Sequence, residues 1–245
     1  MFHKKTAMKK VGILYICTGK YHLFWEDFFI TSQIFFLPEC IKTYYVFTDA
    51  PNIAYENHKY VKKIYQPNLG WPGNTMLRFE MFNQSEHVLR ENEYLFFFNA
   101  NIVFCDFIRE NEILPETQGL TAVIHPYFYG KSNTDFPYDR NPASLAYIPV
   151  GLGNYYFMGG VNGGKTDHYL LLVRMLSRNI RTDLNNGIIA TIYDESHLNK
   201  YLLDKNIHIL NPSYGYPEEW SYPLKPKLMI RDKTQYGGHH FLRHS

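Results

Sequence analysis

Two pairs of polar residues in this sequence are candidates for chemistry. Asn99 and Asn101 stand one residue apart, directly after the apolar run "LFFF". Asp194 and Glu195 are adjacent and open the segment "DESHLNKYLL", whose apolar spacing predicts a short helix. Polar side chains past the end of a buried strand commonly meet a ligand. Adjacent carboxylates that enter a helix can display a catalytic acid or nucleophile, or can simply cap the helix.

The asparagine pair raises the question of a metal ion. Many enzymes place two aspartates at such a strand end, because carboxylate oxygens hold Mg²⁺ or Mn²⁺. An amide is neutral and holds these cations much more weakly, but it can donate hydrogen bonds to ribose or phosphate oxygens. The residues alone leave three alternatives: a metal site was lost, was replaced, or was never needed.

Three further segments have a composition that suits a ligand. "MGGVNGG" (158–164) lacks the Gly-Lys-Ser/Thr ending of a phosphate loop, so its glycines allow either close approach of a ligand or tight turns. His125 stands among aromatic residues in "HPYFYG", where it can stack on a sugar or pack as a half-buried structural histidine. In the C-terminal tail, Arg231 and Lys233 can fold over a diphosphate as a lid or remain solvated.

The predicted elements bring several of these candidates to one edge of a sheet. Through the first hundred residues the apolar patterns alternate as strand, helix, strand, helix and strand, at residues 11–17, 21–36, 43–49, 74–90 and 95–98. Further along, residues 119–130 are predicted to form a strand that runs into a loop, and another strand passes into a helix from about Lys165. This alternation is typical of an α/β fold with a mostly parallel sheet, which binds ligands beyond the carboxyl ends of its strands.

Composition excludes some classes of protein. A chain of 245 residues with 45% hydrophobic content is predicted to form one large domain, and a net charge of +2 excludes the basic field of a general nucleic-acid binder. Three cysteines without a CxxC pair fit a reducing compartment. Residues 1–10 are expected to be a basic, disordered leader, and no apolar run approaches the roughly 20 residues of a membrane span. We therefore expect a cytoplasmic protein without a transmembrane segment.

Five segments, in order, resemble glycosyltransferase family 6, the family of the ABO histo-blood-group transferases and the α-1,3-galactosyltransferases. They are "YYVFTD" (44–49), "HPYFYG" (125–130), "AYIP" (146–149), "YYFMGGVNGG" (155–164) and "DESHLNKYLL" (194–203). The segments "NLGWPGNTMLRFEMF" and "IRDKTQYGGHHFLR" are most similar to the short bacterial members of that family. The resemblance runs from about residue 11 to residue 243.

The resemblance implies a GT-A fold, which is an α/β fold with a mixed, mostly parallel central sheet flanked by helices. Residues 11–245 would form a single catalytic domain whose basic tail, from about residue 225, closes over the donor. Family members move galactose or N-acetylgalactosamine from a UDP-sugar to the 3-hydroxyl of a galactose, with retention at the anomeric carbon. The implied partners are therefore a UDP-sugar and a galactose-containing oligosaccharide.

The matching positions also imply a role for each site residue. Glu195 takes the place of the catalytic carboxylate. The residues implied to bind the donor are Ile16, Cys17, Thr18, Tyr21, Arg78, Asn99, Asn101, Met158, Gly159, Gly160, Asp194, Arg231 and Lys233, and His125, Met158, Gly159 and Gly160 are those expected to line the sugar pocket. The residues implied to meet the acceptor are His125, Pro137, Ile192 and Glu195.

The asparagine pair stands where most of the family has an Asp-x-Asp pair that binds a cation. Short bacterial members with an Asn-x-Asn pair are metal-independent, so the resemblance predicts that this chain uses neither a metal ion nor another cofactor. The protein must then supply the positive charge that faces the diphosphate. Arg231 and Lys233 are the expected sources, and Lys227 is a weaker one.

Substrate choice is less clearly implied. Gly160 leaves room for an acetamido group and favours UDP-GalNAc, whereas Met158 accompanies galactose use and keeps UDP-Gal as the alternative. Pro137 and Ile192 replace the Thr and Trp expected at acceptor positions, and Tyr193 replaces a usual His. The H-type disaccharide Fucα1-2Gal is thus one expected acceptor, and another galactose-terminated glycan is the alternative. A function of another class, an inactive sugar-binding module, is disfavoured by Glu195 within an intact "DESHLNKY".

Overall fold

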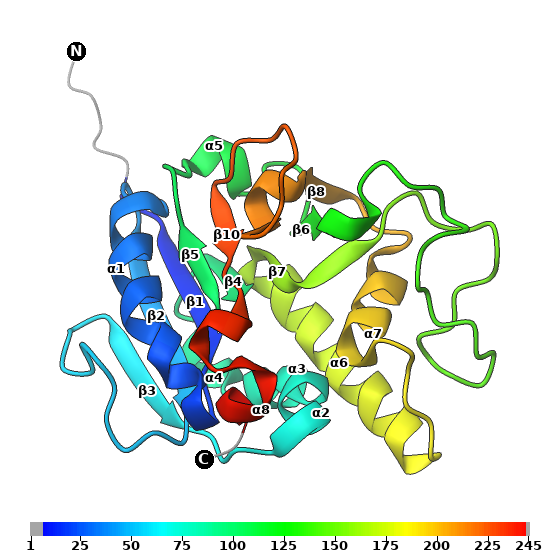
Figure 1. The fold of residues 1–245 in the computed structure, drawn as a ribbon, viewed down its shortest axis with the longest axis horizontal. Helices are drawn as coiled ribbons and strands as arrows, with labels where there is room; N and C mark the ends of the chain where they lie inside the picture. Colours follow the sequence, from blue (N-terminus) through cyan, green and yellow to red (C-terminus); the bar gives the residue numbers. More distant parts are fainter. Residues whose placement is uncertain (1–6, 244–245) are drawn as a thin grey trace.

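The centre of the molecule is a sheet of seven strands, seen in a computed structural model that describes residues 7–243 (Figure 1). Its order is β3-β2-β1-β4-β7-β6-β8. The strands are β1 (Lys10–Ile16), β2 (Ile41–Thr48), β3 (Val61–Tyr65), β4 (Tyr94–Phe98), β6 (Leu120–Ile124), β7 (Phe157–Lys165) and β8 (Ile207–Leu210). Neighbouring strands are parallel except that β7 runs antiparallel to β4 and β6. The predicted GT-A fold, with its mixed and mostly parallel sheet, is confirmed.

Helices cover both faces of this sheet, which explains why its central strands are apolar without alternation. All residues of β1 from 11 to 15 are buried, as expected for a strand that is covered on both sides. Val11 and Ile13 pack in the cluster that contains α1, whereas Leu14 packs in the cluster that contains α3, α6 and α7. Figure 1 shows α1 on one side of the sheet and α6 on the other. These helices are α1 (Trp25–Phe35), α3 (Arg78–Gln84), α6 (Thr166–Asn185) and α7 (Tyr193–Leu202).

A small second sheet returns the C-terminal part of the chain to the carboxyl end of β4. Its order is β5-β10-β9, and its strands are β5 (Ile102–Phe104), β9 (Tyr216–Pro217) and β10 (Leu228–Ile230). Beyond β10, the 3₁₀ turn η4 (Lys233–Tyr236) and the helix α8 (Gly238–Arg243) follow, and α8 packs against the 3₁₀ turn η1 (Gly19–Phe24). The predicted tail is therefore folded onto the start of the chain.

Two predicted helices are subdivided in the structure. The segment 74–90 forms α2 (Gly70–Met76), α3 and α4 (Glu86–Leu89), because the backbone at Leu77 and Ser85 leaves the helical region, with ψ angles of 12° and 9°. The segment 21–36 is divided into η1 and α1. The apolar spacing continues across such interruptions of a helix. It therefore predicted which face is buried but not where the helix is interrupted. The remaining short elements are α5 (Glu110–Ile113), η2 (Pro126–Phe128) and η3 (Pro212–Gly215).

The predicted leader is shorter than its assigned residues 1–10. Lys10 begins β1, and Lys9 forms an ion pair with Glu110, so both residues belong to the folded part of the chain. Residues 1–6 lie outside the described residues, and the disorder expected there stays a prediction. No helix within residues 7–243 combines the length and the apolar character that crossing a membrane requires.

Candidate active site

The strand order reverses between β1 and β4, and a cavity lies at the carboxyl ends of these two strands. β2 and β3 continue the sheet on one side of β1, while β4 pairs with its other side. Because β7 is antiparallel to β4, its first residues reach the same edge, and the backbone N–H of Asn99 donates a 2.8 Å hydrogen bond to the carbonyl of Gly160. Such a switch point is where open α/β sheets bind their ligands.

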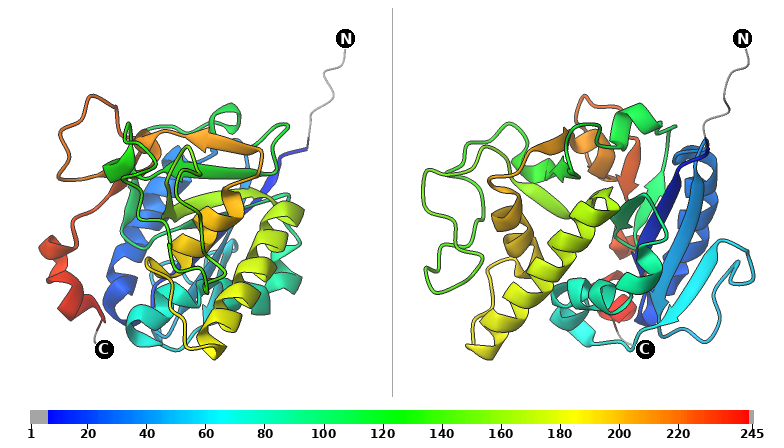
Figure 2. Two further views of the ribbon diagram at one scale, coloured as in Figure 1. Left: turned by 90° about the vertical axis from the view of Figure 1, so that its right-hand side faces the viewer. Right: turned by 180° about the vertical axis from the view of Figure 1, so that it is seen from behind.

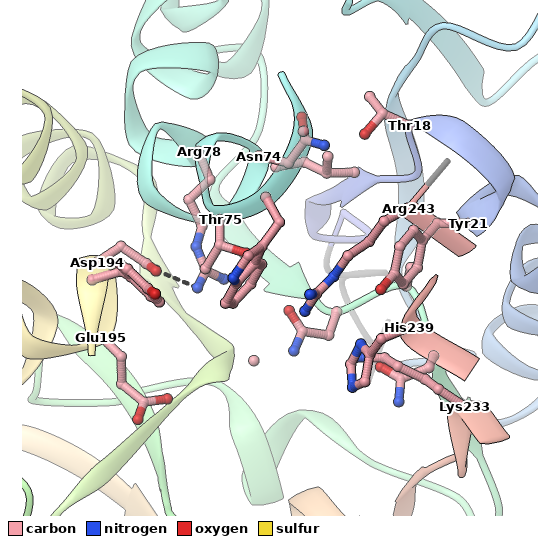
Figure 3. Close-up of a pocket in the computed structure, with 18 of the residues that line it drawn as sticks. Thr18, Tyr21, Asn74, Thr75, Arg78, Asp194, Glu195, Lys233, His239 and Arg243 are labelled. Atoms are coloured by element: carbon pink, nitrogen blue, oxygen red, sulfur yellow. Dashed lines mark ion pairs between the residues drawn. The ribbon is translucent and has the colours of Figure 1, made fainter. Parts of the chain in front are cut away.

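The cavity has a volume of about 470 Å³ and separates charges of opposite sign (Figure 3). Asp194 and Glu195 of α7 lie on one side, beside Arg78, and Lys233, His239 and Arg243 from the tail lie on the other. The remaining residues that line it are Ile16, Thr18, Tyr21, Asn68, Gly70, Trp71, Asn74, Thr75, Phe97, Asn99, Ala100, Asn101, Gly160, Ile192 and Tyr193. A cavity of this size holds a drug-sized ligand.

Glu195 is fixed by two hydrogen bonds, one to each carboxylate oxygen. Its Oε1 accepts a hydrogen bond of 2.8 Å from the hydroxyl of Tyr156, and its Oε2 accepts one of 2.6 Å from the backbone N–H of Gly159. Burial raises the pKa of the Glu195 carboxyl, and both hydrogen bonds oppose this rise because they favour the charged form. The carboxylate is thus held in one orientation at the cavity wall.

Asp194 and Arg78 form an ion pair inside the protein. Asp194 is fully buried, Arg78 is 5% exposed, and the pair is drawn as a dashed line in Figure 3. Nη1 of Arg78 also donates a 2.9 Å hydrogen bond to the carbonyl of Gly159. Burial raises the pKa of Asp194 to about 6, although the charge of Arg78 opposes the rise. Within residues 7–243, Oδ1 of Asp194 is buried and has no hydrogen-bond partner, so the ion pair with Arg78 is the main interaction that stabilises the charge of this residue.

The cationic side of the cavity is built from the C-terminal tail. The ammonium group of Lys233 lies 5.7 Å from the ring centroid of Tyr21, and the guanidinium of Arg243 lies 4.0 Å from that of Trp71. Burial and, to a smaller extent, the charge of Arg243 lower the pKa of Lys233 to about 8. Burial and these two cations lower the pKa of His239 as well. Positive charges crowded in this way favour an anion, which relieves their repulsion.

Two of the basic residues expected to face the diphosphate are engaged elsewhere. Arg231 does not line the cavity: its Nη1 pairs with Asp27 of α1 at 2.5 Å, and its guanidinium lies 4.5 Å from the ring centroid of Tyr236. Lys227 pairs with Glu112 on the other side of the small sheet. Charge and position in the sequence did not distinguish these residues from Arg243, which the sequence analysis had not selected.

The asparagine pair serves two different purposes. Both asparagines line the cavity, Asn99 beside Gly160, and Asn101, which is only 3% exposed, also holds the tail. The Nδ2 of Asn101 donates a 2.7 Å hydrogen bond to the carbonyl of Arg231, and the backbone N–H of Arg231 donates one of 2.8 Å to the carbonyl of Asn101. Within residues 7–243, no group of three or more His, Cys, Asp or Glu side chains is placed to hold a metal ion. Two neutral amides, one bonded to the backbone, do not fit the oxygen set that Mg²⁺ or Mn²⁺ needs.

Of the four residues expected to line the sugar pocket, only Gly160 lines the cavity. Met158 is 5% exposed and lies behind the cavity wall between Gly215 and Gly160. Gly159 contributes its N–H to Glu195, and His125 is half-buried beside Tyr156. Burial lowers the pKa of His125 to about 4, so this ring is neutral at pH 7. Its Nδ1 accepts a hydrogen bond from the N–H of Tyr127, which fits the structural interpretation of this histidine.

Of the other residues predicted to meet the donor or the acceptor, some line the cavity and others do not. Ile16, Thr18, Tyr21 and Ile192 line the cavity. Cys17 is fully buried beneath it, because side chains alternate across β1, and Pro137 lies in the loop between η2 and β7 without reaching the cavity. From the segment of residues 68–82, only Arg78 was predicted to meet the donor, so Asn68, Trp71, Asn74 and Thr75 were missed. Their signal was the run of Asn, Gly and Pro residues that precedes Arg78.

Comparison with known proteins decides the family. A model of glycosyltransferase family 6 matches residues 1–243. The chain belongs to glycosyltransferase family 6. It is 34% identical over 225 residues to the O-antigen biosynthesis glycosyltransferase WbnI of Escherichia coli, which covers 92% of this chain and 95% of that protein. As a family 6 glycosyltransferase it is a hexosyltransferase, with a nucleotide-sugar donor and a glycan acceptor.

Animal members of family 6 are similar over a smaller share of their length. The human globoside alpha-1,3-N-acetylgalactosaminyltransferase 1 is 31% identical over 228 residues, which are 89% of this chain and 64% of that protein. The rat histo-blood group ABO system transferase 1 is 32% identical over 217 residues, which are 85% of this chain and 61% of that protein. This chain thus spans less than two-thirds of these two animal enzymes.

Proposed function

We propose that this family 6 enzyme transfers N-acetylgalactosamine from UDP-GalNAc in α-1,3 linkage to a galactose-terminated acceptor, without a metal ion. The observation that carries the proposal is the separation of charge across the cavity, with cations of the tail opposite the carboxylates of α7. A UDP-sugar has the complementary pattern, since its diphosphate is anionic and its sugar offers hydroxyl donors. The diphosphate would face Lys233 and Arg243, and the sugar would face Asp194 and Glu195.

In the proposed reaction, the bond between the anomeric carbon and the β-phosphate oxygen breaks, and its electron pair leaves with UDP. Lys233 and Arg243 would stabilise the charge that develops on the leaving group, the task that a cation performs elsewhere. The acceptor 3-hydroxyl then bonds to the anomeric carbon, and its proton passes to a phosphate oxygen. Glu195 either stabilises the oxocarbenium-like sugar or forms a transient covalent bond to it, and both roles require the ionised carboxylate.

Two features of the cavity support GalNAc over galactose. Gly160 lines the cavity, and a Cβ there would lie 2.6 Å from Nδ2 of Asn99 and 3.0 Å from Cε of Met158, so the absence of a side chain lets an acetamido group approach a backbone where a larger residue would not fit. Met158, the residue that accompanies galactose use, does not line the cavity, and its thioether lies between Gly215 and Gly160. The name of the human relative, an alpha-1,3-N-acetylgalactosaminyltransferase, agrees with this choice. UDP-Gal is the alternative donor.

The test is a transfer assay with each donor and the disaccharide Fucα1-2Gal, with the products separated by mass spectrometry. We expect the GalNAc trisaccharide to form faster than the galactose trisaccharide. A faster reaction with UDP-Gal would overturn the donor assignment while keeping the enzyme class. If no product forms and UDP-GalNAc is not hydrolysed even without acceptor, the chain is a sugar-binding module rather than a transferase.

A further inference from the structure

An exposed cluster of aromatic side chains lies outside the cavity. Tyr127 and Tyr129 come from the loop after β6, and Trp220 and Tyr222 come from the loop after β9; we call these four residues the aromatic platform. Trp220 and Tyr222 stack with ring centroids 5.2 Å apart and planes at 25°, and Tyr127 meets Trp220 edge-on at 6.0 Å. Tyr127 is 50% exposed and Tyr222 is 42% exposed, while Trp220 and Tyr129 are half-buried. Neighbouring aromatic rings left in water mark a binding surface more often than isolated ones do.

The aromatic platform is held in place before any ligand arrives. The hydroxyl of Tyr216 accepts a 2.9 Å hydrogen bond from the N–H of Tyr222 and lies 3.1 Å from the carbonyl of Trp220, to which it can donate. The hydroxyl of Tyr127 donates a 2.7 Å hydrogen bond to Glu219, which joins the two loops. A ligand would therefore meet rings that are already oriented, with little conformational entropy left to lose.

A continuous series of contacts leads from Glu195 to the aromatic platform. Tyr156 donates its hydrogen bond to Glu195, its ring centroid lies 5.8 Å from that of His125, and His125 lies 5.7 Å from Tyr127. The loop after β6 begins at the edge of the sheet that carries the cavity, because β6 and β4 both run antiparallel to β7. The hydrogen bond from Tyr127 to Glu219 brings the loop after β9 next to it. In the left panel of Figure 2, the orange loop of residues 218–227 and the red C-terminal helix project from the same side.

We propose that the aromatic platform is a second carbohydrate subsite, which binds a neutral sugar of the acceptor beyond the galactose that receives the transferred residue. This inference rests on the proposed function. The faces of Tyr and Trp rings suit the C–H faces of a sugar, and their polar atoms suit its hydroxyls. Glu219 adds a hydrogen-bond acceptor and a negative charge, which disfavours phosphate groups and favours a neutral glycan.

The experiment compares two acceptors, the disaccharide Fucα1-2Gal and the same unit with two further neutral hexoses at its reducing end. For the wild-type enzyme we expect KM for the longer acceptor to be about five-fold lower, the size of one aromatic stacking contact. Trp220→Ala and Tyr127→Ala should each raise KM for the longer acceptor to that of the disaccharide, with kcat and KM for the disaccharide unchanged. Trp220→Phe keeps an aromatic ring at this position and should retain the lower KM for the longer acceptor.

The matched control is Tyr65→Ala, which removes a 77% exposed tyrosine from β3, at the opposite edge of the sheet from β8. It should leave both KM values unchanged. Equal KM values of the wild-type enzyme for both acceptors, or a rise in both KM values in the platform variants, would overturn the proposal. A wild-type chain that modifies neither acceptor contradicts the proposed function instead. The longer glycan is then titrated by calorimetry, where binding by the wild-type enzyme that is lost in Trp220→Ala and Tyr127→Ala supports the subsite and absence of binding by the wild-type enzyme overturns it.

Discussion

The hydroxyl of Tyr156 donates a 2.8 Å hydrogen bond to Oε1 of Glu195, and this contact links the start of β7 to the first turn of α7. Tyr156 is buried, and both burial and the carboxylate raise the pKa of its phenol, so it remains a hydrogen-bond donor at neutral pH. The bond favours the ionised form of Glu195, which burial alone disfavours. Tyr156 therefore positions the carboxylate and favours its charged form.

Replacement of Tyr156 by Phe removes this bond and keeps the ring packing. We expect the pKa of Glu195 to rise further, so the acid limb of the profile of kcat against pH should move to higher pH. At pH 7, kcat should fall about ten-fold, the size of one hydrogen bond to a charged group. The affinity for UDP, measured by calorimetry, should stay unchanged. An acid limb that does not move would show that Tyr156 does not support the charge of Glu195.

Replacement of Glu195 by Gln removes the charge at nearly constant volume. Transfer should fall on the order of 10³-fold, in the range found for essential charged groups at active sites, while UDP binds within about two-fold of the wild-type affinity. Glu91→Gln, at an exposed position in the turn before β4, is the matched control and should leave the rate unchanged. A Glu195→Gln variant with near-normal transfer would remove this residue from the mechanism.

The lowered pKa of Lys233 predicts how the affinity for UDP depends on pH. Because its pKa is lowered to about 8, it loses its charge as pH rises through about 8, and the affinity for UDP should fall over that range. Lys233→Met should weaken UDP binding about ten-fold at pH 7 and abolish the change between pH 7 and 9. Lys225→Met removes another tail lysine, which pairs with Asp106 away from the cavity, and should change neither. A pH dependence that persists in Lys233→Met would assign the titration to another group.

Arg243 and Arg231 should respond differently to replacement by Ala. Arg243 faces the cavity, so its loss should weaken UDP binding about ten-fold with little change in Tm. Arg231 pairs with Asp27, so its loss should cost about 1 kcal/mol or less and lower Tm by a few degrees, with a smaller effect on UDP affinity. Calorimetric titration and thermal unfolding of both variants separate these outcomes. Greater loss of UDP affinity in Arg231→Ala would reverse the assignment of the two residues.

The main sheet could be predicted from the sequence because buried strands leave a strong local pattern. The run "LFFF" and the strand at residues 11–16 are apolar on both faces, and the switch from β7 to α6 falls at the predicted Lys165. The strand β10 could not be predicted in this way, since it has only three residues and is fixed by pairing with distant β5. Its stability comes from tertiary contacts that no local pattern encodes.

The candidate site could be predicted only in part, for a related reason. Glu195 and Gly160 stand in motifs, and the structure places both at the cavity. Whether Arg243 or Arg231 reaches the cavity depends on how η4 and α8 fold back against η1. The number of charges in the tail does not predict this path of the chain. The hydrogen bond from Asn101 to the backbone of Arg231 joins residues 130 positions apart, so the sequence did not show that Asn101 holds the tail in place.

The central claim is that the tail of this enzyme, and not a divalent cation, supplies the charge that faces the diphosphate. The most direct test measures UDP release from UDP-GalNAc in the presence of Fucα1-2Gal, with and without EDTA, for the wild-type enzyme and for Lys233→Met. We predict that the wild-type rate depends on the acceptor and is unchanged by EDTA, and that Lys233→Met is slower under both conditions. A wild-type rate abolished by EDTA and restored by Mn²⁺ would contradict the claim, because a cation would then be performing the task assigned to the tail.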